Sequence, residues 1–212
     1  QKNGLYRPRY SIAFIAFDGE EIGGVGSMYY IKQHKAEMTA IVAVICLDCI
    51  GNENLSVYPT DPAASGLDLD QLMLQAASDL GVNASLAESA RAKTLTSDQE
   101  SFRDPVWANG LLQYWWGINL GIADATPVES SSLLASEPLI YSDKWATGTP
   151  GWIHTSYDNS TSTQALGWVK VDNLQNHIKI AVLSTLRVSQ SVPLPALAVT
   201  VTASPTVVDS GG

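Results

Sequence analysis

The sequence has few cationic side chains: 12 Lys and Arg against 21 Asp and Glu among 212 residues, a formal net charge of −9 at pH 7. A chain with this charge is repelled by nucleic acid and by anionic membrane surfaces, so neither is an expected partner. No apolar run approaches the roughly 20 residues that a membrane-spanning helix requires. A hydrophobic content of 45% excludes wholesale disorder and predicts a globular chain with a sizeable core.

Cysteine is also scarce, because Cys46 and Cys49 are the only two. Their C-x-x-C spacing is compatible with a redox pair or half of a zinc site, but no second pair exists to complete a four-cysteine site. The surrounding sequence, VAVICLDCI, predicts a buried strand, in which residues three apart face opposite sides. Two alternatives remain: two buried thiols, or a local disulfide at the strand end if the chain turns there.

Sparse lysine and plentiful Ser and Thr accompany three glycosylation sequons, at Asn54, Asn83 and Asn159. This composition favours an extracellular (secreted) or cell-surface location. The chain starts at Gln1 and shows no signal peptide, so we expect it to be a cut or partial product.

The most informative stretch is SIAFIAFDGEEIGGVGSMYY, residues 11–30. The apolar run Ile12–Phe17 predicts a buried strand, and it leads directly into Glu20 and Glu21, where ligands bind in open α/β sheets. Neighbouring carboxylates in a low-dielectric site repel each other unless a cation lies between them. A metal would use one as a ligand and the other to hold a proton from metal-bound water. The alternative is a solvated acidic cluster at a helix start, which the helix dipole favours.

The string FDGEEIGGVGS resembles the signature of the zinc-dependent aminopeptidases of the M28 type, a strand followed by D-x-E-E-x-G-x-x-G-S. This resemblance implies that Glu20 is the general base and that Glu21 is a zinc ligand. It further implies a site with two zinc ions in the intact domain.

Three later segments also resemble the family. Asp48 in the D-x-I-G segment implies a ligand for the other zinc, although an Asp at a strand end can simply cap a turn. His154, in a segment similar to I-H-T-x-x-D, implies a third ligand, with Asp158 as a second-shell carboxylate that orients it. Asp98 matches the Asp of S-D-H and is expected to support the metal ligands without binding metal itself, but Gln99 stands where the family has His, which puts normal catalysis in doubt.

The family's remaining ligands, a His and a bridging Asp, precede the strand that opens this chain, and neither residue type occurs before Asp18. His34 and His177 fall in predicted helices, where surface or packing roles are expected. The chain would thus supply at most three protein ligands and the base. We expect its N-terminal strands to be missing, and a missing N-terminal segment or another chain to complete the sheet and the metal site.

Periodic patterns predict strands over 12–17, 41–47 and 55–58, and helices over 27–36, 67–81 and 171–188. Asp98 is expected to precede a short helix. The aromatic and glycine-rich residues 111–122 predict a strand or buried loop, and the polar residues 126–151 predict a long, functional loop. The fold class is α/β, and the resemblance implies a three-layer α/β/α sandwich around a mixed, mostly parallel sheet.

Residues 1–190 are interpreted as the C-terminal portion of a zinc-aminopeptidase-like catalytic domain. Residues 191–212 are interpreted as a linker and the first strand of a following β-sandwich domain. The resemblance implies a secreted exopeptidase that uses a metal-bound hydroxide on peptides or proteins with a free N-terminus. Two alternatives stay open: a non-catalytic relative that acts as an extracellular binding or assembly scaffold, and a relative that acts as a carboxypeptidase or glutaminyl cyclase.

Overall fold

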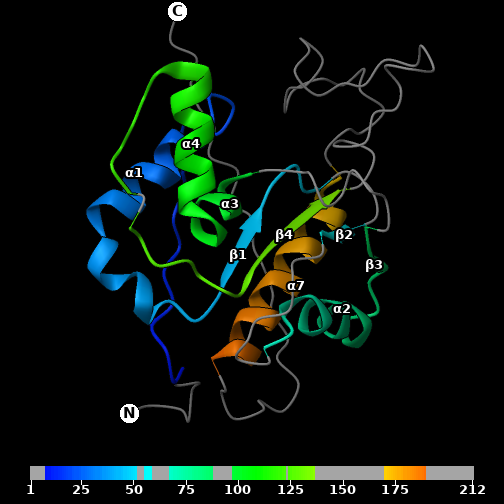
Figure 1. Ribbon diagram of the computed structural model, residues 1–212. Helices are drawn as coiled ribbons and strands as arrows, with labels where there is room; N and C mark the ends of the chain where they lie inside the picture. Colours follow the sequence, from blue (N-terminus) through cyan, green and yellow to red (C-terminus); the bar gives the residue numbers. More distant parts are fainter. Residues whose placement is uncertain are drawn as a thin grey trace, which may run out of the picture.

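The computed structural model describes residues 8–51, 55–58, 67–87, 97–122, 124–136 and 170–189 (Figure 1). Its elements, in chain order, are α1 (Val25–Gln33), the 3₁₀ helix η1 (Lys35–Ala40), β1 (Val44–Leu47), β2 (Leu55–Tyr58), α2 (Leu69–Asp79), β3 (Ala84–Leu86), α3 (Asp98–Arg103), α4 (Pro105–Trp116), β4 (Ser131–Ser136) and α7 (Val171–Val188).

The described strands form one open sheet in the order β1-β4-β2-β3. β1 pairs with β4 and β2 with β3 in parallel, whereas β2 and β4 are antiparallel. The sheet is therefore mixed with mostly parallel pairs, and the α/β fold class predicted from the sequence is confirmed.

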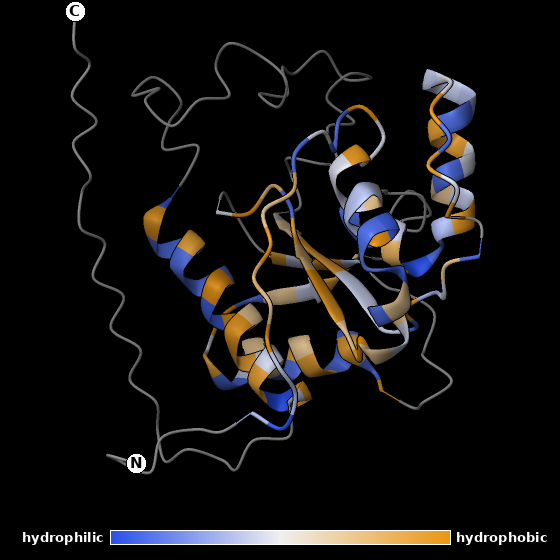
Figure 2. Ribbon diagram, turned by 90° about the vertical axis from the view of Figure 1, so that its left-hand side faces the viewer, coloured by the Kyte–Doolittle hydropathy of each residue, from blue (hydrophilic) through white to orange (hydrophobic). Residues whose placement is uncertain are grey.

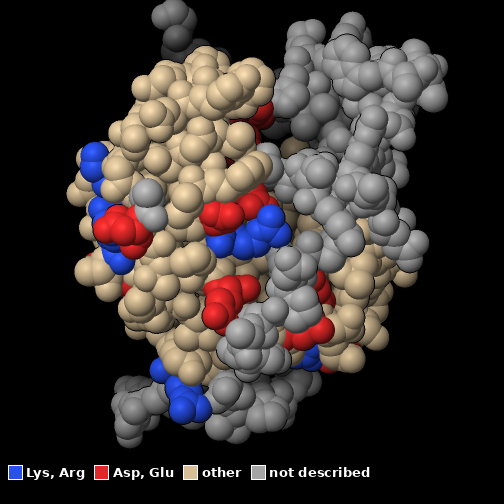
Figure 3. Space-filling view, viewed as in Figure 1, with Lys and Arg blue, Asp and Glu red and all other residues tan. Residues whose placement is uncertain are grey.

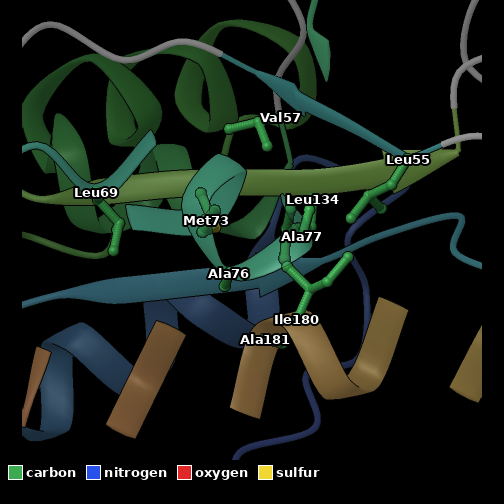
Figure 4. Close-up of a cluster of buried hydrophobic side chains, with 9 residues drawn as sticks. All are labelled: Leu55, Val57, Leu69, Met73, Ala76, Ala77, Leu134, Ile180 and Ala181. Carbon is green, nitrogen blue, oxygen red and sulfur yellow. The ribbon is translucent and has the colours of Figure 1, made fainter. Parts of the chain in front are cut away.

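One face of the sheet is covered by α2 and α7. Side chains of β2 and β4 that share this face, among them Val57 and Leu134, pack against Met73 of α2 and Ile180 of α7, and all four are fully buried (Figure 4). This cluster is the largest of the buried hydrophobic clusters that the structure describes, and it packs α7 against the sheet.

The opposite face contacts α3, and α1 and α4 pack around that helix (Figure 1). Leu133 of β4 and Tyr58 of β2 are buried on this face, and the partly buried Cys46 of β1 packs against their cluster. A further cluster, which includes Met28 of α1 and Phe102 of α3, joins the helices to one another. In Figure 2 the strands are partly hydrophobic and partly pale, while the helices around them show both hydrophobic and hydrophilic stretches.

Several predicted elements are confirmed closely. α7 has the bounds predicted for the last helix, and β2 those predicted for the third strand. α2 lies within the predicted range 67–81, because the Asp68 carboxylate accepts from the Gln71 amide at its start and Gly81, at φ 66°, follows its end. The short helix expected at Asp98 is α3.

The predicted first strand, Ile12–Phe17, is wrong: these residues are in no strand of the described structure. Phe14 is 87% exposed and Ile15 42% exposed, so the run is not buried either. The physical reason is that residues 12–17 form no backbone hydrogen-bond ladder with a neighbouring strand. Among the described strands β1 has only β4 as a neighbour, and it therefore lies at the sheet edge.

Two further predictions are wrong in part. Residues 111–122, expected as strand or buried loop, begin inside α4, which continues to Trp116 and ends at Gly117 with φ 67°. The predicted loop 126–151 contains β4, the strand between β1 and β2. Residues 137–151 lie outside the described part, as do 191–212 with the predicted β-sandwich strand.

No helix among the described residues is long and apolar enough to span a bilayer. On the face shown in Figure 3, basic side chains lie in small groups, most of them beside acidic ones. The described part of this face therefore presents no continuous basic patch.

Candidate active site

Glu20 and Glu21 lie on a tight turn that precedes α1. The amides of Gly23 and Gly24 both donate to the Glu20 carbonyl at 2.8 Å, and the amides of Val25 and Gly26 donate to the carbonyls of Gly19 and Asp18 at 3.0 Å. The turn needs its glycines: Gly19, Gly23 and Gly24 have positive φ, and a Cβ at Gly26 would collide with the backbone of Asp18. The backbone thus closes on itself and holds both carboxylates in one place.

Asp48 follows β1, and its amide donates to the Leu134 carbonyl of β4 at 3.1 Å. The chain then turns sharply, with Cys49 at φ 50° and Gly51 at φ 100°. Cys49 is the only residue other than glycine with positive φ in the described structure, and such strain is commonly found at functional sites. Asp48 is therefore placed at the carboxyl end of a parallel strand, where the sequence analysis expected a ligand.

Asp98 is the first residue of α3, and its Oδ1 atom is buried without a hydrogen-bond partner among the described residues. Burial, and secondarily the charge of Asp48, raise the pKa of the Asp98 carboxyl, while the Ser27 hydroxyl lowers it. Gln99, the position where a His would match the family, is 3% exposed, and its Oε1 is likewise without a described partner.

These segments place four carboxylates close enough to interact. Burial raises the pKa of Glu20 to about 7, and the negative charges of Asp48, Glu21 and Asp98 add to the increase in that order. A carboxyl that titrates near neutrality can both accept and return a proton at physiological pH, which is the property required of a general acid–base group.

Cys46 lies two residues before Asp48, on the face of β1 that contacts α3, and its Sγ is 3.6 Å from the Ser97 Oγ. Burial is the main cause that raises the pKa of this thiol to about 12, and Asp48 and Asp98 contribute. Cys46 therefore stays a neutral thiol. No disulfide joins it to Cys49, which settles the two alternatives from the sequence in favour of thiols.

The fit to a metal ion is partial. Carboxylate oxygens are suitable zinc ligands, and a cation would relieve the repulsion that raises the pKa of Glu20. Within the described ranges, however, no group of three or more His, Cys, Asp or Glu side chains is arranged to hold a metal ion. The third predicted ligand, His154, and its partner Asp158 lie outside the described residues, so the ligand set of Glu21, Asp48 and His154 stays a prediction.

The other two histidines have the roles expected of them. His34 stacks on Tyr30 and lies 3.1 Å from the Glu37 carboxylate near the surface. His177 is 2% exposed, and its Nδ1 accepts a hydrogen bond from the Gly51 amide at 3.0 Å. A surface or packing role was expected for His177, but its bond to the turn after Asp48 could not be predicted, because Gly51 and His177 are 126 residues apart and share no local pattern.

The model of peptidase family M28 matches residues 2–175 of the chain. The matched range includes every site residue predicted from the sequence. No match to a curated protein and no match to a solved structure was found.

Proposed function

Because the chain belongs to peptidase family M28, a family of zinc-dependent peptidases, we propose that it is an aminopeptidase-like exopeptidase with Glu20 as its general base. The observation that supports this most directly is the environment of Glu20. In the metal-free protein its pKa is raised to about 7 by burial and by three carboxylates from the end of β1, the turn before α1 and the start of α3.

The roles of the chain's own residues follow from this arrangement. Glu20 accepts a proton from the water that attacks the peptide carbonyl, and then returns that proton to the departing amine nitrogen. Glu21 and Asp48, with His154, would hold zinc, and the metal, when bound, polarises the carbonyl and lowers the pKa of water. Asp98 and Asp158 would orient the zinc ligands without binding zinc themselves.

The substrate proposed is a peptide or protein with a free N-terminus. An acidic site suits this group, since a terminal ammonium is attracted by surrounding carboxylates. We also place the protein outside the cell, on the strength of its composition and sequons, of which Asn83 is exposed in the structure. Further ligands for a two-zinc site are proposed to come from a segment or chain beyond the described residues.

The experiment is release of N-terminal residues from a peptide panel by the full chain, after chelation and after zinc is added back. Zinc-dependent release that Glu20→Gln abolishes, with zinc content unchanged, supports the proposal. N-blocked peptides in the same panel separate aminopeptidase from carboxypeptidase action, and an N-terminal glutamine peptide detects cyclisation.

One observation favours a second candidate, a non-catalytic binding scaffold: the buried Gln99 stands where the family has His, with its Oε1 unsatisfied among the described residues. That candidate predicts no zinc-dependent turnover on any peptide. If the natural chain had no turnover and Gln99→His created it, we would conclude that the natural chain is a non-catalytic scaffold because Gln99 replaces the His.

A further inference from the structure

The turn after β1 is held from the far end of the sequence. Both polar groups of the Gly51 peptide backbone are bonded to the α7 segment: the amide donates to the His177 Nδ1 at 3.0 Å, and the carbonyl accepts from the Lys170 amide at 2.8 Å. Since Gly51 is only three residues after Asp48, α7 anchors the turn that presents this carboxylate.

This turn requires an anchor, because its backbone is not relaxed. Cys49 has φ 50°, a conformation that L-residues other than Asn, Asp and Gly rarely adopt, and Gly51 has φ 100°. Strained residues of this kind persist only where the surrounding structure over-determines them. On one side Asp48 is bonded to β4 through its amide, and on the other Gly51 is bonded to α7.

The residue type at position 177 is chemically specific. As the acceptor for an amide, Nδ1 carries no proton, so the ring is neutral with its proton on Nε2. An apolar side chain of similar size could fill the same core position, where His177 is 2% exposed, but could not accept this bond. Burying an imidazole costs more free energy than burying an apolar side chain, because the ring loses its hydrogen bonds to water. The bond from the Gly51 amide offsets part of this cost.

We propose that His177 is a positioning residue for Asp48: it fixes the Asp48–Gly51 turn and thereby the distance of this carboxylate from Glu20. The inference rests on the proposed function, in which Asp48 is a zinc ligand. His177 itself acts through the backbone and takes no part in the chemistry.

The test compares three variants of the full chain. His177→Leu removes the acceptor and keeps an apolar side chain in the core. His177→Asn keeps a side-chain oxygen that can accept from the amide. Met73→Ala in α2 is the control, because Met73 is fully buried in the cluster that packs α2 and α7 against the sheet, and its truncation lowers global stability without removing a bond to the turn.

Amide hydrogen exchange of Gly51 in the metal-free protein is measured first. In His177→Leu we expect the Gly51 amide to exchange about tenfold faster relative to the amides of β4, a factor that corresponds to one lost hydrogen bond. In His177→Asn and Met73→Ala this ratio stays near that of the natural protein. An unchanged ratio in His177→Leu overturns the inference.

Zinc affinity is measured second, by competition with a chelator. His177→Leu is expected to weaken zinc binding by about 10- to 100-fold, the usual effect of removing support from a metal ligand. Met73→Ala should leave the affinity unchanged despite a similar loss of thermal stability, and equal affinities in these two variants overturn the positioning role. If the natural protein binds no zinc, the proposed function fails, while the exchange ratio still decides whether His177 holds the turn.

Discussion

The hydroxyl oxygens of Ser27 and Ser101 lie 2.8 Å apart, and this contact joins α1 to α3 directly behind the candidate active site. Ser27 is fully buried, and its hydroxyl also donates to the Gly24 carbonyl at 2.9 Å. The turn of Glu20 and the start of α3 are therefore coupled through one small hydrogen-bond network, which gives the relative position of Glu20 and Asp98 a physical cause.

This coupling predicts non-additive effects. Ser27→Ala and Ser101→Ala should each lower the free energy of unfolding by about 1–3 kcal/mol, since each leaves a buried polar partner unsatisfied. The double variant should lose less than the sum, because it removes both partners. Urea unfolding of the four proteins measures the interaction free energy, and strict additivity would show that the two hydroxyls are not coupled.

Gly26 offers a test of how closely the turn is packed. In Gly26→Ala the new Cβ would collide with the carbonyl oxygen of Asp18, and backbone atoms cannot yield as a flexible side chain can. We expect a loss of about 1–3 kcal/mol, as for other overpacked sites, together with weaker zinc binding. Gly110→Ala in α4 is the control, because a Cβ there meets nothing within 4 Å and should stabilise the helix by about 0.5–1 kcal/mol.

The raised pKa of Glu20 predicts a pH dependence of stability in the metal-free protein. A carboxyl whose pKa rises from 4.5 to about 7 on folding binds its proton more tightly in the folded state. Its contribution is fully present below pH 4.5 and is lost as the pH rises through 7. The melting temperature of the chelated protein should therefore fall over this window, and Glu20→Gln, which cannot ionise, should show a smaller fall.

In Glu20→Gln the melting temperature should still fall somewhat as the pH rises, because burial also raises the pKa of the Asp98 and Glu100 carboxyls. Glu129→Gln, at an exposed position, serves as the matched control and should retain the full slope. A Glu20→Gln profile identical to that of the natural protein would mean that Glu20 is not buried among carboxylates as described.

Elements with a strong local signal could be predicted from the sequence. α7 has apolar residues at helical spacing over its whole length, and its buried positions, which include Ile180 and Ala181, follow that spacing. β2 is a short apolar and aromatic run, and all four of its residues are buried. In these cases the periodicity reports the face that the tertiary structure buries.

The failures have tertiary causes. β4 begins with Ser131 and Ser132, which local composition assigns to a loop, yet both are fully buried because the Ser131 hydroxyl donates to the Val128 carbonyl and that of Ser132 to Asp70. α4 has aromatic residues that favour strands, but Asp104 caps it by accepting from the Trp107 amide, and Pro105 fits its first turn. Asp104 followed by Pro105 is a helix-start signal that is visible in the sequence, and it predicts α4 better than the aromatic composition does.

For the candidate site, resemblance to a motif predicts the roles of Glu20, Glu21 and Asp48 from the sequence, and these roles stay predictions. Their mutual effect on the pKa of Glu20, and the anchor at His177, depend on segments that only the folded chain brings together.

Residues 12–17, which precede the candidate site, are a buried strand in the sequence prediction but are largely exposed in the structure, and this difference can be tested. As a buried strand, Ile12–Phe17 would make Phe14 a core residue, and Phe14→Ala would cost about 3–5 kcal/mol. In the structure Phe14 is 87% exposed, so the same substitution should change the free energy of unfolding by less than about 0.5 kcal/mol.

Phe102→Ala is the matched control for this prediction. Phe102 is 3% exposed and packs against Phe17 with ring centroids 5.9 Å apart, so its truncation should show the full cost of a buried aromatic. Both variants are compared with the natural chain by urea unfolding at several protein concentrations. If Phe14→Ala proved as costly as Phe102→Ala at every concentration, residues 12–17 would be covered within a single chain. If the cost grew with protein concentration, Phe14 would instead be buried between copies, as expected where β1 lies at the edge of the described sheet and can pair with another chain.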